Sequence, residues 1–290
     1  MAMDTKKAAL MGLSMAAAAV PVMGYALSLP FRIRYETAAF QNLPSHLRGL
    51  KILHIADLHG RHPKKMHRDI WPDVLSLDFD MAVLTGDVVL DAVSQIYPHL
   101  DGLKALVKRV PVFYVDGNHE DGCYREMAQL FESIGINVLY NRRSRFAVGR
   151  LDKGKSSVVS VAGFRDYYHL KKQRFREAIP LLDDITSSGD FHIVLSHQPQ
   201  IFDLLCKRAA KTNASPSALV LAGHTHGGQL RLPLFPTLYA PGQGILPRYG
   251  DGWYHSKGLK LFVSRGIGGT HFPIRLFNPP EVAVIQLQKD

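Results

Sequence analysis

Apolar and polar positions along the chain follow two periods, one typical of strands and one typical of helices. Short apolar runs that end in small polar residues predict strands. They cover residues 51–56, 81–85, 110–115, 158–162, 191–195, 218–222, 259–264 and 282–287. Amphipathic stretches predict helices over residues 97–109, 124–134 and 171–185. Strands and helices that alternate in this way predict a layered α/β domain with helices covering the sheet faces.

Two segments depart from this alternation. Residues 35–50 favour an irregular linker or an edge strand, so we place a linker at 35–49 and the domain at 50–290. Residues 227–258 are rich in Pro and Gly and show little periodicity. A long loop of this kind in a compact domain is usually functional or disordered. This loop also holds large apolar residues, namely Leu232, Leu234, Phe235, Leu238, Tyr239, Ile245 and Leu246.

The first 34 residues predict an N-terminal membrane anchor or signal segment. Ala8 to Phe31 carry no charged residue, and this length is adequate to span a bilayer core. A single-pass N-terminal transmembrane helix in the inner cell membrane is the favoured interpretation. A cleaved signal peptide is the second, because Gly24 and Ala26 form a small-x-small pair. A buried core helix is the third. Basic residues flank both ends, so the positive-inside rule leaves the membrane face open.

Composition bounds the class of partner. The chain has 290 residues, 46% of them hydrophobic, which suits one large α/β domain. Lys and Arg outnumber Asp and Glu by 35 to 25, so the net charge of +10 suits an anionic partner, although solubility alone also explains it. Arginines gathered within residues 142–150 form either a solvated face or a contact for acidic lipid heads. Basic and aromatic residues do not interleave, so we expect no nucleic-acid partner.

Five predicted strands end in residues that can bind metal ions. The motifs are Asp57-Leu58-His59, Gly86-Asp87, Gly117-Asn118-His119-Glu120, Ser196-His197 and Gly223-His224-Thr225-His226. In open α/β sheets the ligand site lies outside the carboxyl ends of the strands, so these side chains are expected to converge. A single Asp-x-His arises readily by chance in a chain with 14 histidines. Five such motifs in this order, each after a strand, do not.

The donor types indicate two divalent ions. Carboxylate, imidazole and amide oxygen together suit Mn²⁺, Fe²⁺ or Zn²⁺. One ion would need three or four of these groups, so their number predicts a pair of ions with one bridging carboxylate. Such a pair activates a water and neutralises phosphoryl oxygens. Asp166, which ends another predicted strand, is a candidate to orient a ligand histidine from behind.

The run DLH…GDVV…GNHE…SHQP…GHTHGGQ resembles the calcineurin-like metallophosphoesterase family over roughly residues 50–290. The resemblance implies a two-sheet β-sandwich flanked by helices. It implies one metal held by Asp57, His59, Asp87 and His226, and a second held by the bridging Asp87 with Asn118, His197 and His224. His119 is then the general acid for the leaving oxygen rather than a ligand, a role that suits imidazole.

The hydrophobic start and the ending SRGIGGTHFPIRLFNPPEV resemble a membrane-associated bacterial branch of phosphodiesterases. That branch includes enzymes resembling UDP-2,3-diacylglucosamine pyrophosphohydrolases of lipid A synthesis. The favoured hypothesis is therefore hydrolysis of a phosphodiester or pyrophosphate bond in a membrane- or lipid-linked substrate. A phosphomonoesterase or protein phosphatase on the same metals is the alternative. A non-catalytic metal-binding scaffold is the third, although every expected ligand and the acid are present.

Overall fold

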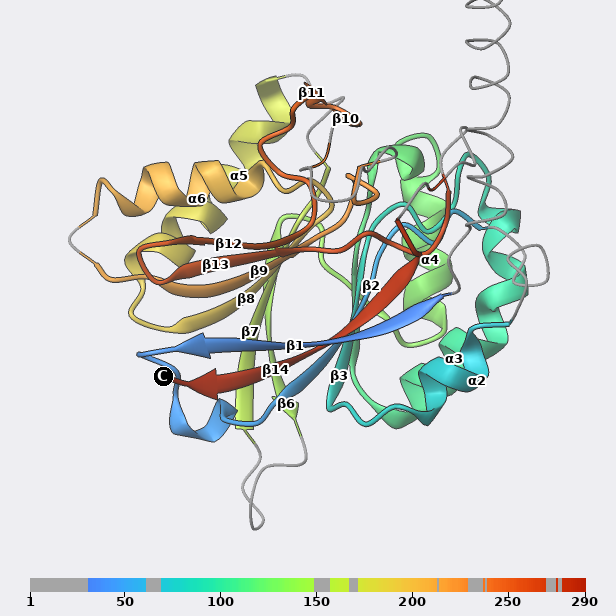
Figure 1. Cartoon of the computed structure of the whole chain (residues 1–290), viewed down its shortest axis with the longest axis horizontal. Helices are drawn as coiled ribbons and strands as arrows, with labels where there is room; N and C mark the ends of the chain where they lie inside the picture. Colours follow the sequence, from blue (N-terminus) through green and yellow to red (C-terminus); the bar gives the residue numbers. More distant parts are fainter. Residues whose placement is uncertain are drawn as a thin grey trace, which may run out of the picture.

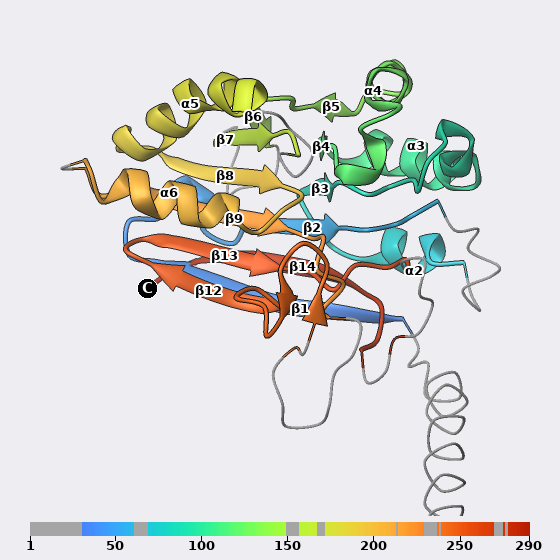
Figure 2. The ribbon, with the colours of Figure 1, turned by 90° about the horizontal axis from the view of Figure 1, so that it is seen from above.

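The computed structural model describes residues 31–60, 69–148, 157–166, 172–212, 214–228, 237, 239–269, 275 and 278–290. Two six-stranded mixed sheets dominate this part of the chain. The first has the order β1-β14-β2-β3-β4-β5 and the second β12-β13-β9-β8-β7-β6. Helices lie outside both sheets, as Figures 1 and 2 show. The two-sheet α/β architecture that the sequence predicted is thereby confirmed.

The first sheet is built from the two ends of the chain and from its first half. Its strands are β1 (Arg32–Phe40), β14 (Glu281–Lys289), β2 (Lys51–Ile55), β3 (Met81–Thr85), β4 (Val112–Val115) and β5 (Asn137–Val138). Between them lie η1 (Ser45–Leu47), α2 (Trp71–Ser76), η3 (Val93–His99), α3 (Leu100–Arg109), η4 (Asn118–Glu120) and α4 (Tyr124–Ser133). From β2 to β5 every neighbouring pair is parallel, whereas β14 runs antiparallel to β2.

The second sheet is built from the second half of the chain. Its strands are β12 (Gly252–Ser256), β13 (Leu259–Val263), β9 (Ser217–Ala222), β8 (Phe191–Ser196), β7 (Ser157–Phe164) and β6 (Arg142–Val148). The helices are α5 (Lys172–Ser187) and α6 (Ile201–Ala209), and β10 (Tyr239–Ala240) pairs with β11 (Gly244–Ile245) as a separate hairpin. The four strands β7, β8, β9 and β13 are parallel, and β12 and β6 close the edges antiparallel.

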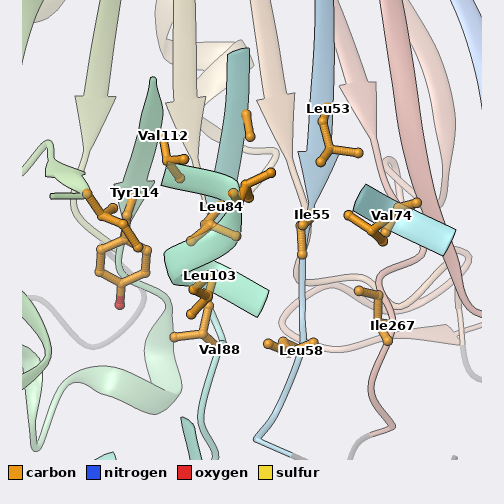
Figure 3. Close-up of a cluster of buried hydrophobic side chains, with 14 of the residues drawn as sticks. Leu53, Ile55, Leu58, Val74, Leu84, Val88, Leu103, Val112, Tyr114 and Ile267 are labelled. Carbon is orange, nitrogen blue, oxygen red and sulfur yellow. The ribbon is translucent and has the colours of Figure 1, made fainter. Parts of the chain in front are cut away.

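Alternation along the strands explains the layers. In β3, Met81 and Val83 face the other sheet, while Ala82 and Leu84 face the helices. Successive side chains of a strand point to opposite faces, so a strand with apolar residues at every position is covered on both sides. Figure 3 shows the outer cluster of the first sheet, where Leu103 of α3 lies among side chains of β2 and β3. A matching cluster lies between the second sheet and helices α5 and α6.

The segment over residues 35–50 was expected as an irregular linker or an edge strand. Residues 32–40 form β1, which pairs with β14 at the edge of the first sheet, and η1 follows. The sheet therefore begins at Arg32 rather than at residue 50. Within the described ranges, no helix combines the length and apolar character that a membrane crossing needs. The predicted anchor over residues 1–34 falls almost wholly on residues 1–30, which lie outside those ranges.

Candidate metal centre

The five predicted motifs meet where the two sheets come together. Three follow the parallel strands β2, β3 and β4 of the first sheet, and two follow β8 and β9 of the second. In Figure 2 the arrowheads of β2 and β8 point the same way, so both sheets deliver their carboxyl ends to one side. The backbone joins the motifs directly, since Asp57 N–H donates to Gly86 and Gly223 N–H donates to His197. The predicted convergence of the strand ends is therefore what the structure shows.

A first cluster contains Asp57, His59, Asp87 and His226, all buried, with one candidate ligand atom of each within 4.8 Å of the others. The Nε2 atoms of His59 and His226 face each other at 3.2 Å, and Asp57 Oδ1 lies 3.6 Å from His226 Nε2. Two imidazole nitrogens gathered with a carboxylate in this way are typical donors for a metal ion. This donor set fits a divalent ion.

A second cluster contains Asp87, His197 and His224. Its centre is His197 Nε2, which lies 3.1 Å from Asp87 Oδ2, 3.0 Å from His224 Nδ1 and 3.2 Å from Asn118 Oδ1. Asp87 belongs to both clusters, so its two carboxylate oxygens can serve two ions at once. All seven predicted ligand positions are thus brought together in the sets that the resemblance implied.

The backbone holds most of these side chains in a strained conformation. Asp57, His59, Asp87, His224 and His226 have φ between 50° and 71°, and they are five of the eight non-glycine residues with positive φ among those described. Left-handed conformations are uncommon outside glycine, and those that persist are concentrated at functional sites. The strain therefore indicates that the turns are shaped to aim the ligands.

Hydrogen bonds fix the tautomers of two histidines. His197 Nδ1 donates to the Thr85 carbonyl at 2.9 Å, and His119 Nδ1 donates to the Leu90 carbonyl at 2.8 Å. In each case Nε2 is turned toward Asp87, at 3.1 Å for His197 and 3.9 Å for His119. The side chain of His119 is 23% exposed whereas that of His197 is buried. His119 therefore stands at the rim of the centre, where an incoming substrate can reach it.

Electrostatics adapt the site to cations. Burial lowers the pKa of His59 and of His224 to about 3, which keeps both imidazoles neutral and able to bind metal. Burial raises the pKa of Asp57 to about 7. For Asp87, burial also favours the neutral form, but His197 and His59 outweigh it and lower the pKa well below its usual range. Conversely, Asp87 outweighs burial and raises the pKa of His197 well above its usual value. The proton on His197 Nε2 that faces Asp87 thus lies where an ion would bind, and an ion bound there would replace it.

Glu120 is a site residue to which the motif GNHE gave no role. Its buried carboxylate accepts the backbone N–H of Asp87 at 2.9 Å, of Val89 at 2.9 Å and of Gly117 at 2.7 Å. It therefore ties the turn after β3 to the turn after β4. Burial and Asp87 raise the pKa of Glu120 to about 8, whereas the N–H donors favour the ionised form. Because three donors face the carboxylate, the ionised form satisfies the contacts best.

A sixth strand end, after β13, also contributes to the centre. Ile267 N–H donates to Ala56 and Gly268 N–H donates to Asp57, so residues 264–269 lie against the first motif. A Cβ on Gly266 would fall 2.5 Å from Asp57 Cβ, and a Cβ on Gly223 would fall 2.5 Å from Asp57 Oδ2. Asp57 is therefore enclosed by two glycines from distant parts of the chain. The pattern SRGIGG was visible in the sequence, but without metal-binding side chains it gave no signal of this role.

Arg275 brings a positive charge to the same side of the first cluster. One guanidinium nitrogen lies 3.3 Å from His226 Nδ1 and donates to the Gly268 carbonyl. After burial and His59, this charge is a further cause of the lowered pKa of His226.

Asp166, predicted to orient a ligand histidine, lies behind the centre. Its backbone N–H donates to Asp116 at 3.3 Å, and its carboxylate favours the charged form of His197 through space. Asp116 itself is held by Arg165, whose Nε lies 2.9 Å from the Asp116 carboxylate. His54 is a buried residue of β2, and its Nε2 lies 2.8 Å from Thr85 Oγ1.

Comparisons with known proteins agree with this geometry. Residues 50–228, more than half of the chain, match the family model described as calcineurin-like phosphoesterase. The metallophosphoesterase YkuE of Bacillus subtilis is 27% identical over 255 residues, covering 85% of this chain and 82% of YkuE. The phosphodiesterase YaeI of Escherichia coli is 28% identical over 267 residues, covering 88% of this chain and 87% of YaeI.

A transmembrane protein with a metallophosphoesterase domain from Danio rerio is 27% identical over 267 residues, covering 86% of this chain and 55% of that protein. Among solved structures, the sulfate thiohydrolase SoxB of Termus thermophilus in complex with glycerol gives a TM-score of 0.40 at 12% identity, over 77% of this chain and 52% of SoxB. From the family match, supported by the buried Asp and His clusters, we conclude that this chain belongs to the calcineurin-like phosphoesterase family and is a metal-dependent phosphoesterase.

Proposed function

We propose that the protein hydrolyses a phosphodiester or pyrophosphate bond with two divalent ions, one in each of the clusters described above. The observation that carries the proposal is the position of Asp87, which belongs to both clusters and lies 3.9 Å from the rim histidine His119. Bound there, two ions supply positive charge against the phosphoryl oxygens and promote ionisation of an attacking water. Mn²⁺, Fe²⁺ and Zn²⁺ are the candidate ions, because the donors are imidazoles, carboxylates and one amide.

Within this proposal the side chains have distinct roles. Asp57, His59 and His226 would hold the first ion, Asn118, His197 and His224 the second, and Asp87 would be shared by both. His119 delivers a proton from Nε2 to the oxygen that leaves phosphorus, while water forms the new P–O bond. The Leu90 carbonyl, at 2.8 Å from Nδ1, holds the ring in orientation. Asp166 acts on His197 through space.

We further propose that the substrate is membrane- or lipid-linked and that residues 1–30 attach the protein to the membrane. Three observations support this: the uncharged segment Ala8–Phe31, the net charge of +10, and apolar side chains exposed in the loop over residues 227–258. The Danio rerio relative carries a name that combines a transmembrane protein with this domain. A diester is favoured over a monoester because the Escherichia coli relative is named a phosphodiesterase.

Hydrolysis of bis-p-nitrophenyl phosphate by the purified full chain with Mn²⁺ tests the reaction, with p-nitrophenyl phosphate as the monoester comparison. We expect the diester to react faster. His119→Ala should lower the diester rate about 10²–10⁴-fold, the usual contribution of a general acid, while the bound metal stays at two ions per chain. Asp87→Asn should lower both the rate and the metal content. Full activity in either variant contradicts the assigned roles, and a faster monoester reaction favours a phosphomonoesterase.

The substrate class is tested with diesters that differ only in their lipid. UDP-2,3-diacylglucosamine, which would release UMP, and glycerophosphodiesters with and without acyl chains form a suitable panel. We expect acylated substrates to give the higher kcat/KM. Equal values for acylated and deacylated partners would remove the lipid-linked proposal and leave the phosphodiesterase assignment intact. Release of UMP would favour the lipid A branch, and no release at high enzyme concentration would exclude it.

A further inference from the structure

The hairpin of β10 and β11 presents large apolar side chains to solvent. Ile245 is 81% exposed, the adjacent Leu246 67%, and Tyr239, paired with Ile245 across the hairpin, 42%. Fully burying one such side chain contributes about 1.5–3 kcal/mol, so a partner that covered all three would gain binding free energy from each. Contiguous exposed apolar groups of this kind usually mark an interaction surface. We call Tyr239, Ile245 and Leu246 the apolar tip.

The base of this hairpin is fixed to the metal centre. Thr237 Oγ1 donates to the Gly227 carbonyl at 3.1 Å, directly after the motif that contains His224 and His226. On the other side, Thr225 Oγ1 donates to the Gly250 carbonyl. The apolar tip thus extends from residues that touch the candidate ligand turn. Its position relative to the centre is set by hydrogen bonds at both ends.

The backbone at the tip is strained in a way that keeps Leu246 outward. Leu246 has φ +52°, a conformation that favours glycine and is a genuine outlier for a bulky side chain. Gln243 holds the turn from inside, because its side chain accepts from Tyr249 N–H at 2.9 Å and donates to the Tyr249 carbonyl at 2.8 Å. Tyr249 is buried and its hydroxyl donates to Asp203 at 2.7 Å. A rigid base therefore supports an exposed and strained apolar residue.

The N-terminal segment enters the domain at this same side. β1 is parallel to β14, and β14 is antiparallel to β2, so Arg32 lies at the edge where β2 ends. Backbone hydrogen bonds lead from there to the first cluster: Arg32 to Pro280, Glu281 to Gly266, and Ile267 to Ala56, which precedes Asp57. The uncharged stretch Ala8–Phe31 comes directly before Arg32. A membrane that received this stretch would therefore face the metal centre.

We propose that the apolar tip docks on the surface of an anionic phospholipid bilayer and holds the metal centre facing it. This deepens the proposed function, on whose membrane-linked substrate it rests. We take the partner to be a bilayer because Arg32, which follows the uncharged stretch, and the apolar tip lie on the same side of the domain as the metal centre. Charge agrees through the net charge of +10 and the absence of acidic residues over residues 239–250, while Arg248 is itself paired with Asp203 at 2.9 Å.

The arginines of β6 are a weaker candidate for this contact. Arg142, Arg143 and Arg145 each form an ion pair with a carboxylate of the protein, at 3.4, 2.6 and 3.2 Å. Their charge is thus balanced within the domain. They also occupy the edge strand of the second sheet farthest from β12, the strand that follows the hairpin.

Depth-dependent fluorescence quenching tests the docking without reference to activity. The full chain carrying Leu246→Trp is reconstituted in vesicles of phosphatidylglycerol and phosphatidylcholine, with and without lipids brominated near the headgroup. Val158→Trp is the matched control, because Val158 is 53% exposed but lies at the start of β7, beside the edge strand β6 and far from β12 in the sheet. The parent chain supplies the background from its two native tryptophans. An apolar group at an interface lies about 5–10 Å into the headgroup boundary, within reach of the bromines.

We expect the added fluorescence at position 246 to fall at least twofold with brominated lipid and that at position 158 to stay unchanged. Equal quenching at both positions, or none at position 246, overturns the proposal. A change in the fluorescence at position 246 that depends on protein concentration rather than on lipid also overturns the proposal, because it would show contact with a second copy of the chain.

A rate ratio provides the second test. Leu246→Glu should lower the ratio of the rate on a bilayer-embedded phosphodiester to the rate on bis-p-nitrophenyl phosphate about tenfold, whereas Val158→Glu should leave it unchanged. An unchanged ratio in Leu246→Glu overturns the docking. If the parent chain hydrolyses no diester at all, the proposed function fails while the quenching result still decides the docking.

Discussion

Replacing Glu120 with glutamine tests whether this residue couples the turns after β3 and β4. The carboxylate accepts three backbone N–H groups at 2.7–2.9 Å in a fully buried position. Glutamine keeps one acceptor oxygen and places an NH₂ group where the other stood. Depending on the orientation of the amide, one or two of the three bonds are lost. A hydrogen bond to a charged group contributes about 1.5–3 kcal/mol, so we expect a loss of about 1.5–6 kcal/mol in the free energy of unfolding.

The same change should weaken metal binding, because this carboxylate holds the N–H of the bridging Asp87. Outer partners of metal ligands typically contribute about 10–100-fold to affinity, and we expect a decrease in that range for Mn²⁺. Urea unfolding in chelator and Mn²⁺ titration by calorimetry measure the two effects. Glu126→Gln, an exposed acid of α4, is the control and should change stability by less than about 0.5 kcal/mol. A Glu120→Gln protein with the stability and Mn²⁺ affinity of this control would refute the reasoning.

Three further substitutions follow from the structure. Gly223→Ala places a Cβ 2.5 Å from Asp57 Oδ2, so metal analysis should find no more than one ion per chain, and two ions would contradict the assignment. Arg165→Met leaves the buried Asp116 carboxylate without its cationic partner, which should lower the free energy of unfolding in urea by about 3–5 kcal/mol. Adding Asp116→Asn should recover most of that loss, and no recovery would contradict the role of the ion pair. Burial lowers the pKa of His54 from 6.5 in the unfolded chain to about 3 in the folded protein. Between these two pH values the unfolded state binds more protons than the folded state, so the free energy of unfolding decreases as the pH falls from 6.5 towards 3. His54→Gln should remove up to about 1.4 kcal/mol per pH unit of that slope, and an unchanged slope in unfolding measured from pH 7 to 4 would exclude the effect.

Local patterns were sufficient for most strands and helices. The strand predicted over residues 81–85 matches β3, and the helix predicted over 124–134 ends one residue later than α4. The helix predicted over 97–109 begins late: α3 starts at Leu100 and residues 93–99 form the 3₁₀ segment η3, which contains Pro98. Proline removes a backbone donor, which explains why a regular α-helix does not extend through this position.

Other elements were not predicted because their signals compete with neighbouring features. No helix was predicted at residues 201–209, where α6 follows the SHQP motif. Residues 227–258 were expected to lack regular structure, which is wrong for residues 252–256, because they form β12. That strand pairs antiparallel with β13, and such an edge pairing depends on the sheet rather than on the five residues themselves.

The candidate ligands could be predicted because each one lies at the carboxyl end of a strand, and parallel strands bring those ends together. The supporting residues could not. Glu120 acts by accepting hydrogen bonds from two separate turns, and Gly266 acts through contact with Asp57, which lies 209 positions earlier in the sequence. That contact exists because the chain after β13 in the second sheet meets the end of β2 in the first, an arrangement that no local pattern encodes.

The left-handed backbone at Asp57, His59, Asp87, His224 and His226 also has a consequence for protein engineering. A non-glycine residue in this conformation costs on the order of 1 kcal/mol relative to glycine. Glycine at one of these positions would therefore relax the chain while removing a metal ligand. A His226→Gly protein is the natural starting point for a folded but inactive form that retains substrate. Such a trap could be used to capture from a cell extract the compound that the active enzyme destroys.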